Sequence, residues 1–123
     1  MIKNTVIEFY DEEPIANISA CLRYKFERVI FVGFSEWNNT DEYKAVKHFL
    51  QKDEIGVKEV MYYELTPNSL ANSTQKIKKI IENEIEQGRQ CFFDITGGEE
   101  IALVAIGILM QQYDLPLHQI NIA

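Results

Sequence analysis

Strand-like and helix-like segments alternate along this chain, and this alternation limits the folds that it can adopt. The segments rich in β-branched and aromatic residues are 5–10, 28–34, 57–65, 90–95 and 117–122. Between them, apolar residues recur every three or four positions, the spacing of one buried helical face. Strands separated by helices of this length form parallel β-α-β units. The sequence therefore predicts an α/β fold with a mostly parallel, doubly wound sheet of about five strands flanked by helices.

The second and third helices carry the clearest signals at their ends. Thr40 and Ser73 fit the N-caps of these helices, and Gly56 and Gly88 lie near their expected ends. Pro14 suits the first turn of the first helix. The side chains expected on the buried faces of the second and third helices are Tyr43, Val46, Phe49, Leu50, Ile77, Ile80, Ile81 and Ile85. Glutamates and lysines are expected on the other faces of the third helix.

The strand at 28–34 is a nearly continuous apolar run, so we expect it to be covered on both faces and to lie centrally in the sheet. The fourth helix is predicted at 99–113. Cys21 and Cys91 lie in apolar segments without a metal-ligand spacing, and we expect both to be buried, reduced thiols. No metal or cofactor is expected.

Length and charge limit the class of protein. A chain of 123 residues is expected to form a single domain, residues 1–123. It contains neither a run of ~18 apolar residues nor the pattern of a signal peptide, so we expect a cytoplasmic protein without a membrane segment. The formal net charge of −7 argues against binding a long nucleic acid. Fixed backbone N–H groups can still hold a small anion on an acidic protein.

The turn Thr96-Gly97-Gly98 lies between the fourth strand and the fourth helix. Two residues without Cβ expose a row of backbone N–H groups at the positive end of the helix dipole, which suits an anion. Alternatively, the glycines only permit close packing of helix and strand. The motifs G-x-x-x-x-G-K-S/T and G-x-G-x-x-G are absent, so neither a P-loop nor a standard dinucleotide site is expected. Glu99 and Glu100 either stabilise the helix start or, at Glu99, contact a ligand.

Loops that follow parallel strands share one edge of the sheet, where ligands of such folds bind. The loops expected there are 11–13, 35–39, 66–69 and 96–100. Trp37 could stack on a base or serve as a partly buried anchor. His48 and His118 form no recognisable triad, and we assign no catalytic residue.

The stretch Phe93-Asp94-Ile95-Thr96-Gly97-Gly98 resembles the N/D-x-T-G-G-T-K/R motif of CARF domains, the CRISPR-associated Rossmann fold sensors. The loop Asp11-Glu12-Glu13-Pro14-Ile15-Ala16-Asn17 is similar to the corresponding loop of type III CRISPR effectors that join a CARF domain to a nuclease. The resemblance covers the whole chain as a five-strand pattern, but only the Thr-Gly-Gly motif is specific. Glu99-Glu100 departs from the usual Thr-Lys or Asn-Lys.

The resemblance implies a Rossmann-like sensor that forms a homodimer and binds cyclic oligoadenylate, of four or six adenylates, across its two-fold axis. Thr96, Gly97 and Gly98 would then cradle phosphate or ribose. Asp11 and Glu12 would rim the pocket, while Ser35 would donate a hydrogen bond. The full set of expected ligand-binding residues is Asp11, Glu12, Ser35, Trp37, Thr96, Gly97, Gly98 and Glu99.

Two alternatives stay open beside the sensor. A ring nuclease would cleave the cyclic oligoadenylate slowly by positioning a ribose 2′-hydroxyl, and an interaction domain would bind no nucleotide. The nuclease domain of the family's effectors is expected to be absent from this chain. Ring size, cleavage and the identity of any effector are not decided by the sequence.

Overall fold

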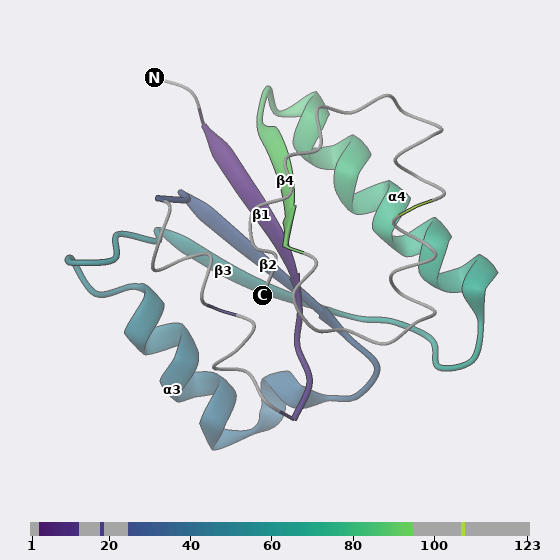
Figure 1. Cartoon of the computed structure of the whole chain (residues 1–123), viewed down its shortest axis with the longest axis horizontal. Coiled ribbons are helices and arrows are strands. Elements are labelled where there is room, and N and C mark those ends of the chain that lie inside the picture. The colour runs from purple at the N-terminus through teal and green to yellow at the C-terminus, as the bar shows by residue number, and fades with distance from the viewer. Residues whose placement is uncertain (1–2, 13–17, 19–24, 95–106, 108–123) are drawn as a thin grey trace.

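The computed structural model describes residues 3–12, 18, 25–94 and 107 (Figure 1). In that part of the chain the elements are β1 (Asn4–Phe9), β2 (Arg28–Gly33), the short 3-10 helix η1 (Trp37–Asn39), α3 (Asp41–Leu50), β3 (Glu59–Glu64), α4 (Leu70–Glu86) and β4 (Gln90–Asp94). The predicted fifth strand and almost all of the predicted first and fourth helices lie outside the described residues.

The four described strands form one sheet in the order β3-β2-β1-β4. Each neighbouring pair is parallel, with Ile7 opposite Ile30 between β1 and β2, and Ile7 opposite Phe93 between β1 and β4. β2 has a strand on each side and every one of its residues is buried. The predicted α/β fold with a mostly parallel sheet is therefore confirmed, as is the central, covered strand predicted at 28–34, which ends one residue earlier, at Gly33.

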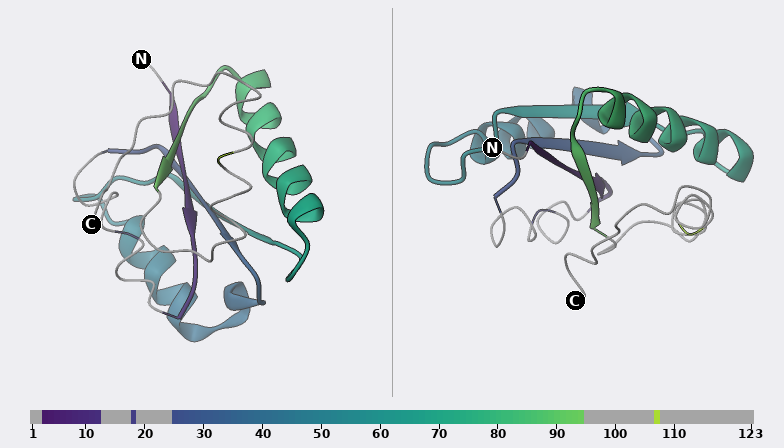
Figure 2. Two further views of the ribbon diagram at one scale, coloured as in Figure 1. Left: turned by 45° about the vertical axis from the view of Figure 1, so that its right-hand side comes forward. Right: turned by 90° about the horizontal axis from the view of Figure 1, so that it is seen from above.

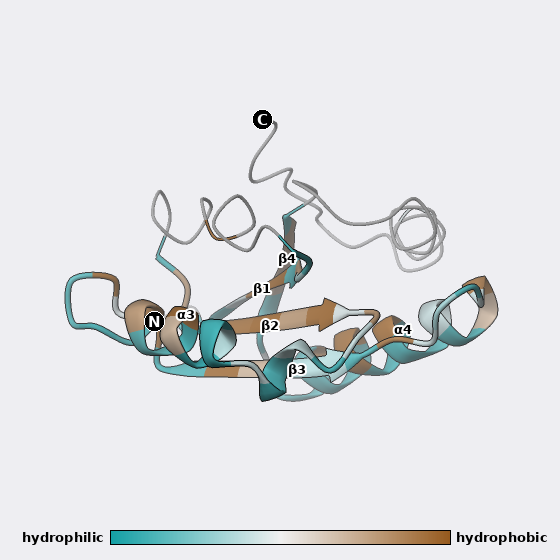
Figure 3. Ribbon diagram, turned by 90° about the horizontal axis from the view of Figure 1, so that it is seen from below, coloured by the Kyte–Doolittle hydropathy of each residue, from teal (hydrophilic) through white to brown (hydrophobic). Residues whose placement is uncertain are grey.

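Alternate residues of the strands pack against different helices, so the sheet has a core on each face (Figures 1 and 2). The first core contains Val6, Val29, Phe31 and Val60 from the strands with Tyr43, Val46 and Leu50 from α3. The second contains Ile7, Ile30, Val32 and Phe93 with Ile77, Ile80 and Ile81 from α4. Figure 3 shows β2 as a largely hydrophobic strand, as burial on both faces requires.

Helix α3 begins at its predicted cap and ends earlier than predicted. The Thr40 side chain accepts a hydrogen bond from the backbone N–H of Tyr43 at 3.1 Å. The helix ends at Leu50, because the chain turns back there and the Val57 N–H reaches the Leu50 carbonyl at 3.1 Å. Phe49 was expected on the buried face, but it is 38% exposed and lies under the Lys52 ammonium group, 5.8 Å from the ring centre.

Helix α4 begins four residues before the predicted start, at Leu70, because Ser69 rather than Ser73 is its N-cap. Ser69 has an extended backbone and its Oγ accepts a hydrogen bond from the Asn72 N–H at 3.3 Å. Asn68, at φ 60°, makes the turn that places Ser69 there. Ser73 is instead fully buried inside the first turns of the helix, with its Oγ 3.4 Å from the Thr66 carbonyl oxygen.

The buried face of α4 also differs from the prediction at its last turn. Ile85 was expected to be buried but is 46% exposed, whereas Glu84 is 1% exposed. Glu84 accepts hydrogen bonds from the Thr5 hydroxyl and from Arg28 Nη1, both at 2.6 Å. Helix α4 ends at Glu86, just before Gly88 at φ 75°, as predicted.

A network of charged side chains surrounds Glu84 at the amino ends of the strands. Arg28 Nη2 lies 3.2 Å from Glu59 Oε1, and Arg89 Nη2 lies 2.8 Å from Glu27 Oε1. The second arginine also approaches Glu59, at 3.8 Å. This network joins α4 to β2 and β3 at the edge opposite the predicted ligand loops.

Candidate functional site

The loops that follow β1 and β2 begin side by side at the carboxyl edge of the sheet. Phe9 is opposite Val32 in the register, and the Tyr10 N–H donates to the Val32 carbonyl at 2.8 Å. β1 also lies between β2, which is followed by α3, and β4, which is preceded by α4, and these two helices cover opposite faces of the sheet. Ligands of open α/β sheets bind at the carboxyl ends of the strands where the order of the strands reverses in this way. The described part of the candidate site is therefore built by the first two of these loops.

Four of the eight predicted ligand residues are described. Asp11 and Trp37 are half-buried, while Glu12 and Ser35 are exposed. The Trp37 ring lies 6.3 Å from the ring of Tyr10, the residue before Asp11, so the structure brings the two loops together as predicted from the topology. The other four predicted ligand residues, Thr96, Gly97, Gly98 and Glu99, lie outside the described residues.

A cluster of aromatic rings supports these two loops from within the core. The ring centre of Tyr10 lies 5.2 Å from Phe31, 5.5 Å from Tyr43 and 6.1 Å from Tyr62, each in an edge-to-face arrangement. Tyr43 and Tyr62 are 5.7 Å apart. Edge-to-face pairs of this kind stabilise a fixed packing by about 0.5–1.5 kcal/mol each beyond the area they bury. The floor beneath Trp37 is consequently a packed aromatic layer, contributed by the loop after β1 and by β2, β3 and α3.

Gly33, the last residue of β2, leaves the space in which this layer meets the loop. A Cβ at this position would lie 2.4 Å from the Tyr62 hydroxyl oxygen, 2.7 Å from the Tyr10 carbonyl oxygen and 3.2 Å from Trp37 Cδ1. A contact below 3 Å is far inside van der Waals distance, and one of these atoms belongs to the backbone. Glycine is thus required here by the close approach of three neighbouring elements.

The Tyr62 hydroxyl uses the space above Gly33 to reach the loop that follows β2. It donates a hydrogen bond to the Ser35 carbonyl oxygen at 2.5 Å. Burial raises the pKa of Tyr62 to about 12, although hydrogen bonds to the backbone of Trp37 and Ser35 act in the opposite direction. The hydroxyl therefore stays protonated at neutral pH and remains a donor.

Thr40 holds the other end of the same loop. Its backbone N–H and its hydroxyl both donate to the Trp37 carbonyl oxygen, at 3.0 and 2.6 Å. The same hydroxyl oxygen accepts the bond from Tyr43 that caps α3. The loop from Ser35 to Thr40 is accordingly bonded to β3 at its beginning and to the start of α3 at its end.

Tyr10 brings a buried hydroxyl to the same cluster. The residue is 2% exposed, and its hydroxyl oxygen makes no hydrogen bond to any described residue. Burial raises the pKa of Tyr10 to about 12, and the charge of Glu42 adds to this effect. A buried hydroxyl without a hydrogen-bond partner lowers the free energy of unfolding by about 1–3 kcal/mol. The Tyr10 hydroxyl is therefore expected to destabilise the fold.

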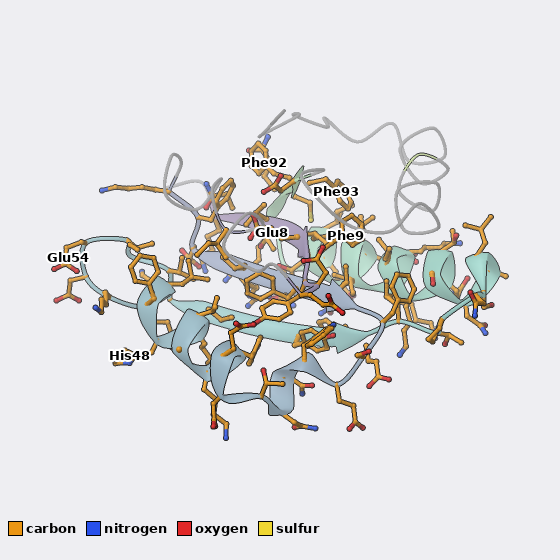
Figure 4. All side chains as sticks on the ribbon, turned by 60° about the horizontal axis from the view of Figure 1, so that its bottom comes forward. Glu8, Phe9, His48, Glu54, Phe92 and Phe93 are labelled. Atoms are coloured by element: carbon orange, nitrogen blue, oxygen red, sulfur yellow. The ribbon has the colours of Figure 1, made fainter. Side chains whose placement is uncertain are left out.

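Two buried carboxyl groups lie next to each other near the end of β1 and β4. Glu8 is opposite Asp94 in the register, and the two residues are 1% and 0% exposed. Figure 4 shows Glu8 on β1 beside Phe9, with Phe92 and Phe93 on the neighbouring strand. Asp94 is the first residue of the sequence motif that contains Thr96-Gly97-Gly98, so a buried acid leads directly into the predicted anion-binding turn.

Three residues of the site were not identified from the sequence. The pair Tyr62-Tyr63 was interpreted as strand packing, and Gly33 and Tyr10 were counted only as strand residues. A glycine within a strand pattern signals a close approach of another group, and that signal was present at Gly33. Which group approaches could not be read from the pattern, because Tyr62 lies 27 residues from Ser35.

A separate cleft of about 430 Å³ lies between β3 and α4. It is lined by Tyr63, Lys76, Lys79, Ile80 and Asn83. Both lysines are exposed, in agreement with the solvated helix face predicted for them, and Lys76 Nζ donates to the Glu64 carbonyl oxygen. None of the predicted ligand residues lines this cleft.

Other residues considered from the sequence do not add to the site. His48 is exposed and projects from α3 away from the sheet (Figure 4). Cys91 is buried, which raises the pKa of its thiol to about 12, and the expected buried thiol is confirmed there, while Cys21 lies outside the described residues. Within the described ranges, no group of three or more metal-ligating side chains gathers, and no helix is long and apolar enough to cross a membrane.

Solved structures of known proteins share the fold of this chain. No family model and no curated protein matches the chain. Among solved structures, Can2 from Sulfobacillus thermosulfidooxidans in complex with cyclic tetra-adenylate matches 98% of this chain, with a TM-score of 0.71 and 18% identity. The protein VC1899 from Vibrio cholerae matches 96% of this chain, with a TM-score of 0.75 and 17% identity.

The match extends over a part of each of these proteins. It covers 33% of the Can2 chain and 30% of the VC1899 chain, so this chain spans about one third of their length. At such low identity the likeness establishes the fold, and it confirms the predicted Rossmann-like α/β architecture.

Proposed function

We propose that this chain is a CARF-like sensor domain that binds a cyclic oligoadenylate at the carboxyl edge of its sheet. The observation that carries the proposal is the match of fold over 98% of the chain to Can2, a protein solved with cyclic tetra-adenylate. The Thr-Gly-Gly motif after β4 supports it independently, from the sequence. The biological setting that we propose is a type III CRISPR response in the cytoplasm.

The loops after β1 and β2 have the chemistry that such a ring requires. A cyclic oligoadenylate presents flat bases, ribose hydroxyls and singly charged phosphates. Trp37, half-buried against Tyr10, is proposed to stack on an adenine, a contact worth about 1–3 kcal/mol per base. Ser35, exposed at the start of its loop, would donate to phosphate or ribose, while Asp11 and Glu12 would accept hydrogen bonds from hydroxyl or amino groups.

Phosphate binding must overcome the charge of the whole chain. At a formal net charge of −7, general attraction to a polyanion is unfavourable. Fixed backbone N–H groups at Thr96, Gly97 and Gly98, followed by a helix start, are the donors proposed for the phosphates. Glu99 is proposed to face the ligand through a ribose hydroxyl or an amino group.

A homodimer is the proposed form of the sensor. A cyclic tetra- or hexa-adenylate is itself symmetric, and one copy of the two loops offers contacts to only part of the ring. A two-fold axis through the ring would give each half of the ligand the same set of residues. Light scattering at tens of micromolar protein, with and without the ring, measures the oligomeric state of the chain. A monomer in both conditions contradicts the proposed dimer.

The direct test is equilibrium binding of labelled cyclic tetra-adenylate and cyclic hexa-adenylate, with linear tetra-adenylate as the control ligand. Bound species are then separated from cleaved species. The sensor predicts stoichiometric binding of one ring in intact form, and quenching of the single tryptophan, Trp37, on binding. Cleavage of the ring would support the nuclease instead, and the absence of binding to both rings would refute the proposal.

Substitutions at two glycines, one in the predicted turn and one outside it, test where on the chain the ring binds. Gly97→Val would place a branched side chain where the phosphate approaches and should weaken binding at least tenfold. Gly107→Val is the matched control, because Gly107 is exposed and none of the residues that the structure describes lies within 4 Å of a Cβ at that helical position. Equal affinity of the two variants, both folded by circular dichroism, would exclude the turn at 96–98 as the anion site.

A further inference from the structure

We infer that Tyr62 is a positioning residue for the candidate site: its hydroxyl fixes the backbone at Ser35 and thereby places the side chains of Ser35 and Trp37. Tyr62 comes from the third strand and lies 27 residues from Ser35 in sequence. The inference rests on the proposed function for its effect on ligand binding. Its effect on the position of Trp37 is independent of any ligand.

The packing of the Tyr62 ring directs its hydroxyl towards the loop that follows β2. Its ring packs edge-to-face against Tyr10 at 6.1 Å and Tyr43 at 5.7 Å, which sets the direction of the hydroxyl. That hydroxyl donates to the Ser35 carbonyl oxygen and lies within hydrogen-bonding reach of the Trp37 backbone. Of the described atoms that approach Gly33, the Tyr62 hydroxyl oxygen is the nearest, since a Cβ there would lie 2.4 Å from it.

The loop needs such a contact because its first part contains no regular secondary structure. Phe34, Ser35 and Glu36 lie between the end of β2 and the start of η1. Thr40 bonds the Trp37 carbonyl from the α3 side, whereas Tyr62 bonds the Ser35 carbonyl, at the beginning of the loop, from the side of β3. Loss of the hydroxyl should therefore loosen Ser35 and Trp37 while the sheet and α3 stay in place.

The test compares Tyr62→Phe with Tyr63→Phe. Tyr62→Phe removes one oxygen and keeps the packed ring, so the domain should remain folded. Tyr63→Phe is the matched control, because it removes the same atom from the next residue of the same strand, which packs in the core on the opposite face. Acrylamide quenching of Trp37 fluorescence in the ligand-free protein reports the position of the loop, since Trp37 is the single tryptophan.

The expected result has two parts. In the ligand-free protein, Tyr62→Phe should raise the quenching constant of Trp37 about twofold, and Tyr63→Phe should leave it unchanged. Affinity for cyclic tetra-adenylate should fall about three- to tenfold in Tyr62→Phe alone, the share of one hydrogen bond. Urea unfolding of each variant separates these changes from a change in overall stability.

The outcomes distinguish the two proposals. Unchanged quenching in Tyr62→Phe overturns the positioning role, whether or not the protein binds a ring. Increased quenching with unchanged ring affinity overturns the part of the inference that concerns the ligand. If the unaltered protein binds no ring while quenching still rises in Tyr62→Phe, the proposed function fails and the positioning of the loop by Tyr62 is supported.

Discussion

Replacing Glu84 with glutamine should destabilise the protein strongly, although the change is nearly isosteric. Glu84 is 1% exposed and accepts hydrogen bonds from Thr5 and Arg28, both at 2.6 Å. Glutamine can still accept the bond from Thr5. It cannot neutralise Arg28, whose side chain is only 9% exposed.

The magnitude follows from what remains beside the arginine. Removing one member of a buried ion pair costs about 3–5 kcal/mol, because the other charge stays buried. Arg28 keeps Glu59 at 3.2 Å, but that carboxylate is 49% exposed and a pair with it contributes about 0–1 kcal/mol. We therefore expect Glu84→Gln to lower the free energy of unfolding by about 3 kcal/mol, or the melting temperature by about 10 °C in a domain of this size.

Urea unfolding followed by circular dichroism measures this loss, with Glu82→Gln on the exposed face of the same helix as the control. The double variant Arg28→Met with Glu84→Met removes both charges and should recover most of the stability. It leaves the buried Thr5 hydroxyl without its acceptor, so a deficit of about 1 kcal/mol should remain. A loss below 1 kcal/mol in Glu84→Gln, or a double variant as unstable as the single one, would refute the reasoning.

Three further predictions concern buried residues of the strands and of the loop after β1. Gly33→Ala should lower the free energy of unfolding, measured in urea, by about 1–3 kcal/mol, because its Cβ would meet the Tyr62 hydroxyl at 2.4 Å and the Tyr10 carbonyl at 2.7 Å. An unchanged free energy of unfolding would show that these neighbours move aside without cost. Since the pKa of Tyr10 is raised from 10.0 to about 12, the folded state holds the proton more tightly, and stability that is complete below pH 10 should be lost as the pH rises through 12. Tyr10→Phe should reduce this alkaline loss and match or exceed the original stability at pH 8, and a less stable variant would indicate an unrecognised partner of the hydroxyl. In a Cys21→Ser background, Cys91 should react with a thiol reagent only in denaturant at pH 8, because burial raises its pKa to about 12; rapid reaction in the native state would contradict this.

The order and type of the described strands and α-helices were predictable because their signals are local, whereas the short helix η1 was predicted as loop. The apolar residues that follow Arg28 require cover on both faces of their strand wherever it lies, and β2 is indeed central. Thr40 caps α3 through a bond to a residue three positions away, and Gly88 provides the positive φ after α4. Each of these features depends on a few neighbouring residues, so the sequence alone contains it.

The candidate site was predictable only in part. The topology places the loops of Asp11 and Ser35 at one edge of the sheet, and the structure brings these loops together through Tyr10 and Trp37. The ligand roles of these residues, and of the turn at 96–98, remain predictions that rest on the resemblance to CARF domains.

Tertiary structure decided which side chains of a given element are buried and what they contact. Helical periodicity placed Ile85 inside and glutamates outside, but Arg28 of β2 lies 56 residues from Glu84 and makes the carboxylate the buried group. Likewise, Tyr62 becomes a contact of the ligand loop only because β3 pairs with β2 and Gly33 leaves room for its hydroxyl. Periodicity reports only the apolar face of an element, whereas a buried charge or a bonded hydroxyl depends on a partner that the folded chain brings from a distant position.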